Sequence, residues 1–206
     1  IVPLNRAQSA IFGSGIPAEH PWPEPGEFNP HAGDAIGNHG NVHPQKGYRH
    51  LWAIAREAGR AVALCGPLDL SNADVARTYS EQVAPNVRPE DDLRLEYAPD
   101  AALVEAMRDC AALVYPYEPW VNVQASGAVR TAIEFGRPIV VSTHREYFDL
   151  PDSFPAVDLG SSAADQAAVV EAAIVDAEQV FAAQAAHAKA RGWGWFVRLV
   201  KDQVGK

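Results

Sequence analysis

The sequence predicts an α/β fold: a doubly wound, mostly parallel sheet of six strands with helices on both faces. Candidate strands and helices alternate from Asp34 to the end of the chain. Most candidate strands, such as residues 139–141, are continuous apolar runs, which is typical of strands buried on both faces of a parallel sheet. Glycines such as Gly136 stop helices shortly before a strand. Together these observations indicate a Rossmann-like sheet, whose ligands bind at the carboxyl ends of the strands.

The first thirty residues differ from the rest of the chain. Residues 1–4 are typical of the end of a strand, and residues 6–12 of a short helical turn. Residues 16–30 contain five prolines, which predicts an extended and fairly stiff connector. Taken alone, this segment fits a surface loop without function as well as it fits a hinge.

The first half of the sheet is expected to contain three strands and two helices. In chain order these are strand 34–39, helix 47–58, strand 61–65, helix 72–83 and strand 93–97. Leu51, Ile54 and Ala58 share one face of the first helix. Ser71 is expected to begin the second helix, with Asp74 completing a capping box. The third strand alternates apolar and charged residues, so we expect it to be less buried.

The second half is expected to contain three further strands, each preceded by a helix or turn. In chain order the elements are helix 99–110, strand 111–115, a helix beginning after Ser126, strand 139–142, strand 156–159, helix 163–190 and helix 195–204. The long alanine-rich helix is expected to be broken once. An apolar stripe follows the last helix (Trp193, Trp195, Phe196, Leu199 and Val200). This stripe fits packing on the chain's own sheet and packing on a partner domain equally well.

Composition narrows the class of protein. The 206 residues are 48% apolar and 21% charged, as in an ordinary globular domain. A net charge of -9 argues against nucleic acid or a membrane surface as the main partner. Cys65 and Cys110 lie in apolar surroundings without CxxC spacing, so we expect reduced core cysteines in a cytoplasmic protein. There is no apolar run of membrane-spanning length and no signal peptide pattern. Because the only methionine is Met107, we expect a processed chain or part of a longer one.

Two stretches contain groups suited to binding an anion. Ser126, Gly127 and Ala128 open a helix whose free N–H groups and dipole attract a phosphate, although Ser126 also fits a simple N-cap. The loop between residues 39 and 47 carries Gly40 and Lys46 beside a helix entrance. Lys46 alone fits a solvated surface residue as well. The loop is neither a Walker loop nor a GxGxxG motif.

Four motifs, in a fixed order along the chain, are more specific than either anion-binding stretch alone. They are HGNVHPQKGYRHL at 39–51, AVALCGP at 61–67, YAPDAALVEAMRDCAALVYPY at 97–117 and QASGAVRTAIEFGRPIVVS at 124–142. Over residues 34–159 this series resembles the C-terminal, donor-binding half of group 1 glycosyltransferases, which have two Rossmann-like domains. The resemblance implies a nucleotide-sugar donor such as a UDP- or GDP-sugar, bound without a metal, and retaining transfer of a hexosyl group. It assigns no catalytic residue within this chain.

The resemblance also implies the donor-binding residues. Lys46 and the backbone at 126–129 would hold the diphosphate, and the base would lie near residues 97–99. The complete expected set is Gly40, Asn41, Lys46, Tyr97, Ala98, Glu118, Gln124, Ser126, Gly127, Ala128, Val129 and Thr131.

The chain departs from the family pattern at three positions. Asn41 replaces an arginine that usually follows the first HG, and Val123 and Thr131 replace the two family glutamates. Thr131 can still bind a ribose hydroxyl, while Glu118 or Gln124 would take over the contact with the sugar. Arg130 fits either a source of positive charge or a solvated helix face. These departures favour, as an alternative, a non-catalytic nucleotide-binding or subunit-interaction module.

By the same resemblance, residues 1–30 are an interdomain connector with a remnant of an N-terminal domain, 31–190 the nucleotide-sugar-binding domain and 191–206 a crossing helix. An N-terminal acceptor-binding domain or a separate partner chain would complete the enzyme, and we expect little transfer by this chain alone. A flavodoxin-like or sugar-phosphate isomerase domain ranks third, since it explains neither the Lys46 loop nor the last helix.

The histidines fit a metal site poorly. His39 and His43 lie four residues apart on a loop, and a zinc site would have to recruit His31 or His50 as well. We therefore expect His39 to line the cleft at the end of its strand, and His144 to do likewise. Ser126 lacks the GxSxG pattern of a serine nucleophile.

Overall fold

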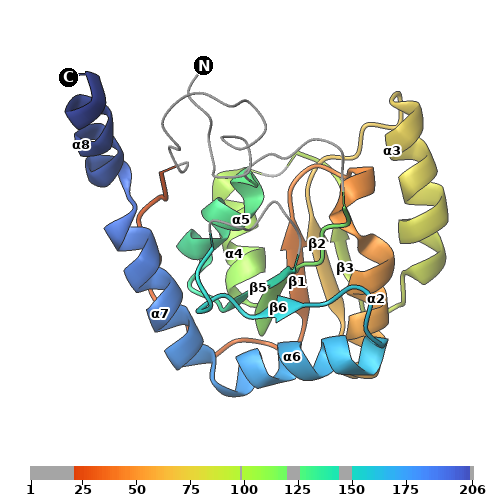
Figure 1. Cartoon of the computed structure of the whole chain (residues 1–206). Coiled ribbons are helices and arrows are strands. Elements are labelled where there is room, and N and C mark those ends of the chain that lie inside the picture. The colour runs from red at the N-terminus through yellow and green to blue at the C-terminus, as the bar shows by residue number, and fades with distance from the viewer. Residues whose placement is uncertain (1–20, 98, 120–125, 144–149, 205–206) are drawn as a thin grey trace.

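A computed structural model describes residues 21–97, 99–119, 126–143 and 150–204 (Figure 1). These residues form a six-stranded sheet in the order β3-β2-β1-β4-β5-β6. The strands are β1 Ile36–His39, β2 Val62–Cys65, β3 Asp92–Arg94, β4 Ala112–Tyr115, β5 Ile139–Ser142 and β6 Ala156–Val157. Every neighbouring pair is parallel. The predicted Rossmann-like sheet is therefore confirmed, with the strand order of dinucleotide-binding folds. The strand and helical turn predicted in residues 1–12 lie outside the described residues.

Helices cover both faces of this sheet. They are α2 Tyr48–Glu57, α3 Ala73–Thr78, α4 Asp100–Arg108, α5 Gly127–Thr131, α6 Ala163–Val175, α7 Ala177–Ala190 and α8 Trp193–Val204. Short turns lie between them: η1 Pro44–Lys46, η2 Tyr79–Val83, η3 Ala84–Asn86 and η4 Ala132–Phe135. Figure 1 shows α4 and α5 on one side of the strands and α2 on the other.

The continuous apolar runs follow from burial on both faces. Leu113 and Tyr115 of β4 pack in the cluster that contains α4, η4 and α7. Ala112 and Val114 of the same strand pack in the opposite cluster, with α2 and α6. Since successive side chains point to opposite faces, a strand with no solvent-facing side favours apolar residues, and a buried polar residue such as Asn38 of β1 bonds to a neighbour, here the carbonyl of Val114 at 2.7 Å. All four residues of β1, β2, β4 and β5 are buried.

The cysteines are buried and free, as predicted. Cys65 ends β2, and Cys110 lies just before β4, where its thiol donates to the carbonyl of Ala106. Burial raises the pKa of the Cys110 thiol to about 12. These cysteines therefore serve as small apolar core residues.

The helix predicted at residues 72–83 begins and ends differently from expectation. Asn72, rather than Ser71, caps α3, because its side-chain oxygen accepts hydrogen bonds from the N–H groups of Asp74 and Val75. The Ser71 hydroxyl donates to Asp69 instead, so the predicted capping box is wrong. After Thr78 the helix continues as the π-turn η2. The break predicted between 163 and 190 is confirmed at Asp176, between α6 and α7.

The third strand is shorter than predicted. β3 ends at Arg94, and Tyr97 lies beyond it with 82% of its surface exposed. β3 is one of the two edge strands of the sheet, and its charged residues Asp92 and Arg94 form an ion pair with each other at 2.9 Å. Edge strands commonly carry charged residues, because these residues discourage pairing with other chains.

The described part of the connector packs on the body of the domain. Trp22 is buried against Phe154 and His187, and its backbone N–H donates to the carbonyl of Arg191 at 3.1 Å. Further along, the buried guanidinium of Arg137 donates to the carbonyls of Asn29 and Ala111. The connector and the end of α7 are thus fixed side by side. From there α8 continues away from the sheet (Figure 1).

Candidate functional site

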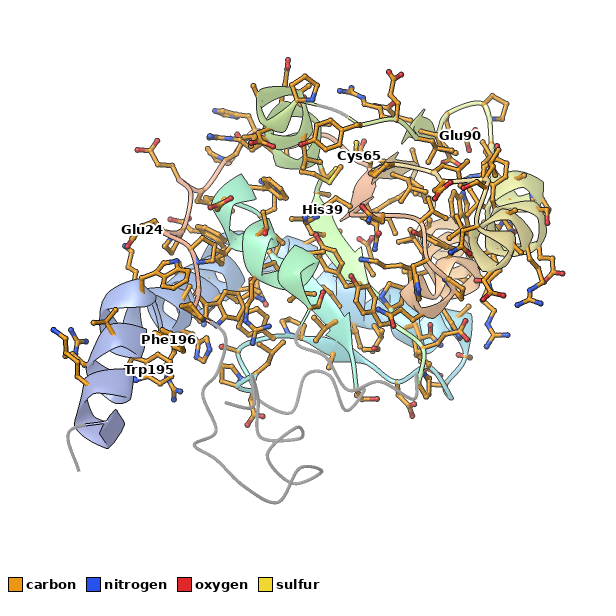
Figure 2. All side chains as sticks on the ribbon, turned by 90° about the horizontal axis from the view of Figure 1, so that it is seen from above. Glu24, His39, Cys65, Glu90, Trp195 and Phe196 are labelled. Atoms are coloured by element: carbon orange, nitrogen blue, oxygen red, sulfur yellow. The ribbon has the colours of Figure 1, made fainter. Side chains whose placement is uncertain are left out.

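The site lies where the strand order reverses. β1 pairs with β2 on one side and with β4 on the other. The chain leaves β1 toward one edge of the sheet and leaves β4 toward the other, so the loops after these two adjacent strands run apart. Such a switch point is where open α/β sheets bind ligands. Figure 2 looks onto this end of the molecule, with His39 and Cys65, the last residues of β1 and β2, near the centre. The helix α5 enters the site from the same end.

Lys46 is a buried cation at this point. Proline at the start of η1 and Gly47 in a left-handed conformation (φ 64°) shape a tight turn that directs Lys46 inward. Only 7% of Lys46 is exposed, so its interpretation as a solvated surface residue is wrong. Its ammonium donates to the hydroxyl of Tyr117 and lies 4.4 Å from the centre of that ring. Within the described ranges, no carboxylate forms an ion pair with Lys46.

Gly40 brings the β1 loop close to this ammonium. Its φ of +104° is a conformation that residues with a side chain rarely adopt. A Cβ atom there would lie 3.1 Å from the Lys46 nitrogen and 3.4 Å from the Cβ of Ala128. The loop after β1, the turn η1 and the first residues of α5 therefore converge on one cation.

Ser126 caps α5, as predicted. Its hydroxyl oxygen accepts from the N–H of Val129 at 3.3 Å, and the hydroxyl donates to Tyr117 at 3.2 Å. Gly127 faces open space, since a Cβ added there would meet nothing within 4 Å. The side chain of Thr131 points back along the helix and donates to the carbonyl of Gly127 at 3.0 Å. Gly127, the first residue of α5, is therefore exposed, whereas Val129 and Arg130 of the same turn are buried.

Two hollows adjoin this region, and Tyr97 lines both. One, of about 180 Å³, includes His39, Gly40, Asn41 and Cys65 in its wall. The other, of about 490 Å³, is lined by the end of β3 and by residues at the start of α4. The smaller hollow therefore connects the predicted base region at Tyr97 with Gly40 and Asn41 of the β1 loop, while neither hollow is lined by Lys46 or by residues 126–129. Ala98 lies outside the described residues.

His39 lines the smaller hollow but is largely buried. Its ring nitrogen Nδ1 shares a hydrogen bond of 2.5 Å with the hydroxyl of Tyr115, and Phe135 packs on the ring at 4.9 Å. Burial, and then the charge of Lys46, lower the pKa of His39 to about 3. The imidazole is therefore neutral at physiological pH and adds no positive charge to the site. His144 lies outside the described residues.

Other predicted residues have identifiable partners. Glu118 forms an ion pair with Arg49, 2.9 Å between Nε and Oε1, and its N–H donates to the carbonyl of Gln45. Arg130 is 4% exposed and stacks over Trp22, with 5.3 Å between guanidinium carbon and ring centre, so the interpretation as a solvated helix face is wrong. Asn41 is exposed. Val123 and Gln124 lie outside the described residues.

The loop histidines do not gather into a metal cluster. His43 caps η1, where its Nδ1 accepts from the N–H of Gln45 at 3.4 Å. Among the residues that the structure describes, no three of the types His, Cys, Asp and Glu come together as they would to hold an ion. The same described ranges contain no helix with the length and apolar character needed to span a bilayer.

Solved structures with this fold are known. AviGT4, a glycosyltransferase involved in avilamycin A biosynthesis, superposes with a TM-score of 0.68 at 18% identity, over 98% of this chain and 62% of its own. HepE from Anabaena in complex with UDP-glucose gives 0.69 at 12% identity, over 99% and 63%. A UDP-forming trehalose-phosphate synthase from Burkholderia xenovorans gives 0.64 at 12% identity, over 83% and 44%. The chain shares the fold of these glycosyltransferases.

The likeness is structural and covers part of each neighbour. The chain spans 62%, 63% and 44% of the lengths of these three glycosyltransferases. No protein-family model matches the sequence. No curated protein matches it either.

Proposed function

We propose that this chain is the donor-binding half of a glycosyltransferase that uses a nucleoside-diphosphate sugar. The observation that carries the proposal is Lys46: a buried ammonium without a carboxylate partner among the described residues, placed beside the first turn of α5. A buried cation is stable when an anion or a set of dipoles compensates its charge. A diphosphate between Lys46 and α5 would supply that compensation.

The same arrangement suits the chemistry of sugar transfer. As the bond between the anomeric carbon of the sugar and the diphosphate of the donor breaks, the sugar becomes oxocarbenium-like and the leaving nucleoside diphosphate gains negative charge. Lys46 and the N–H groups at Gly127 and Ala128 would stabilise this charge, because their position is fixed before the reaction begins. The base would lie against Tyr97, in the hollows that continue from Gly40. The UDP-glucose complex of the fold neighbour HepE favours UDP among the candidate nucleotides.

The proposal includes a second domain. The chain spans about two thirds or less of each neighbour's length, which fits an N-terminal acceptor-binding domain, in the same polypeptide or in a partner chain. We propose the division into connector 1–30, donor-binding domain 31–190 and crossing helix 191–206. Trp193 and Val197 of α8 are 61% and 46% exposed, which supports contact of this helix with that domain. Retaining transfer of a hexosyl group and a cytoplasmic location complete the proposal.

One alternative has an observation in its favour. Asn41 is exposed and uncharged, and the hydroxyl of Thr131 is bound to the carbonyl of Gly127. Without the family's arginine and glutamates at the aligned positions, the chain fits a non-catalytic nucleotide-binding or subunit-interaction module. Binding of UDP without donor consumption, once the missing domain is supplied, would favour that module over the enzyme.

The test is calorimetric titration of the chain with UDP, GDP and ADP. Lys46→Met removes the charge while keeping much of the volume, and Lys189→Met on the exposed face of α7 is the matched control. A hydrogen bond from a charged group is worth about 1.5–3 kcal/mol, so Lys46→Met is expected to weaken binding about tenfold to a hundredfold. The control variant should bind as the unaltered chain does. If none of the three nucleotides binds, or if Lys46→Met binds equally well, the proposal fails.

A further inference from the structure

We propose that Tyr117 is the positioning residue of this site: its hydroxyl and ring hold the Lys46 ammonium beside the first turn of α5, ready for a diphosphate. The identity of the ligand rests on the proposed function, whereas the positioning of Lys46 by Tyr117 does not depend on it. Tyr117 follows β4 by two residues in the sequence YPY.

Tyr117 is itself held rigidly. Only 1% of the residue is exposed, and its ring packs edge-on against Tyr115 with 6.1 Å between ring centres. Its backbone is attached to the neighbouring strand, because the buried hydroxyl of Ser142 donates to the Tyr117 carbonyl at 2.7 Å. A side chain fixed by packing and by its backbone can impose its geometry on a flexible partner.

The hydroxyl of Tyr117 links two separate elements of the site. It accepts from the ammonium of Lys46, which lies on η1, and from the hydroxyl of Ser126, the N-cap of α5. Lys46 and Ser126 are distant in the sequence, and both donate a hydrogen bond to the hydroxyl of Tyr117. A phenol oxygen has acceptor capacity for both donors. One side chain thus sets the position of the cation relative to the helix end.

Small residues lie next to the ammonium where the β1 loop and α5 approach it. A Cβ placed on Gly40 would lie 3.1 Å from the Lys46 nitrogen and 3.4 Å from the Cβ of Ala128, so the residues at this position are a glycine and an alanine. Lysine has a flexible four-carbon stem, and an anion must otherwise immobilise it on binding. A lysine already held by the Tyr117 hydroxyl and ring face loses less freedom when a phosphate arrives, which raises affinity.

The first experiment needs no ligand. Tyr117→Phe removes only the hydroxyl and keeps the ring, and Tyr79→Phe in η2 is the matched control. Each protein is labelled briefly with acetic anhydride, and modification of Lys46 is measured by mass spectrometry relative to the exposed Lys189. We expect Lys46 labelling to rise several-fold in Tyr117→Phe and to stay unchanged in Tyr79→Phe. Equal Lys46 labelling in all three proteins would overturn the inference, whatever the ligand is.

The second experiment separates positioning from a merely structural role. UDP and uridine are titrated into the unaltered chain and both variants. Loss of one hydrogen bond to a charged group predicts about tenfold weaker UDP binding by Tyr117→Phe, with uridine binding unchanged. Equal loss for UDP and uridine, or no loss for UDP, would contradict a role in holding Lys46 for the diphosphate. If the unaltered chain binds no nucleotide while the labelling result holds, the proposed function fails and the positioning of Lys46 stands.

Discussion

The buried histidine of β1 makes the stability of the fold depend on pH. The pKa of His39 falls from 6.5 to about 3 in the folded chain, because burial and the charge of Lys46 disfavour its protonated form. Between these two values the unfolded chain binds the proton and the folded chain does not. The contribution of His39 to stability is therefore fully present above about pH 6.5 and is lost as the pH falls toward about 3.

The size of this effect follows from linkage. A difference of one pKa unit corresponds to about 1.4 kcal/mol, and lowering the pH from about 7 to about 5 removes about 2 kcal/mol through His39 alone. Other groups titrate in the same range: the pKa values of His43 and His50 are also lowered by burial, and carboxylates contribute below about pH 5. The measurement must therefore compare two proteins rather than two pH values.

The comparison is between the unaltered chain and His39→Gln, which keeps a polar side chain for the Tyr115 hydroxyl but does not titrate. Urea unfolding followed by circular dichroism at several pH values gives the free energy of unfolding of each. We expect the variant to be less stable at about pH 7 and to lose about 2 kcal/mol less on acidification to about pH 5. Parallel pH profiles of the two proteins would refute the assignment of a neutral, buried His39.

Two further predictions concern the connector and the β1 loop. Arg137→Met should lower the free energy of unfolding by about 2–4 kcal/mol, because two backbone carbonyls lose their buried donor. Urea unfolding measures this change, and the control Arg198→Met, at an exposed position, should alter the free energy little. Gly40→Ala should weaken UDP binding at least about tenfold in calorimetry, because its φ of +104° is strained for alanine and its Cβ would crowd Lys46. Gly194→Ala in α8, where an added Cβ would meet only the Arg198 side chain at 3.7 Å, is the control, and equal affinity of the two glycine variants would contradict this role of the loop.

Most of the fold was predictable from the sequence, because burial determines which positions of a strand or helix are apolar. The apolar runs of β2, β4 and β5 reflect burial on both faces, and Gly136 closes η4 in the left-handed conformation (φ 68°). Boundaries were less predictable where two residues compete for one role. Ser71 and Asn72 can both cap a helix, and the choice depends on a local hydrogen bond of Ser71 to Asp69.

The site was predictable in part. The stretches around Lys46 and Ser126 each indicated an anion site, and the family resemblance joined them. Neither showed that a tyrosine connects them, because Tyr117 comes close to Lys46 only through the parallel arrangement of β1 and β4. The exposed-face interpretation of Arg130 was wrong for a similar reason. Trp22, which stacks against it, belongs to the connector, and no sequence pattern relates two segments so far apart. The sequence feature that could have pointed to Tyr117 as a site residue is its place in the segment YPY, directly after a buried strand.

The most direct test of the central claim locates the phosphates of the nucleotide. The backbone amide resonances of Gly40, Gly127 and Ala128 can be followed by NMR while UDP or uridine is added to ¹⁵N-labelled chain. We expect UDP to shift all three amides strongly, and uridine, which lacks the diphosphate, to shift them little. Shifts confined to another part of the molecule, such as the hollow of about 190 Å³ beside Thr143 and Asp158, would contradict a diphosphate site at Lys46 and α5.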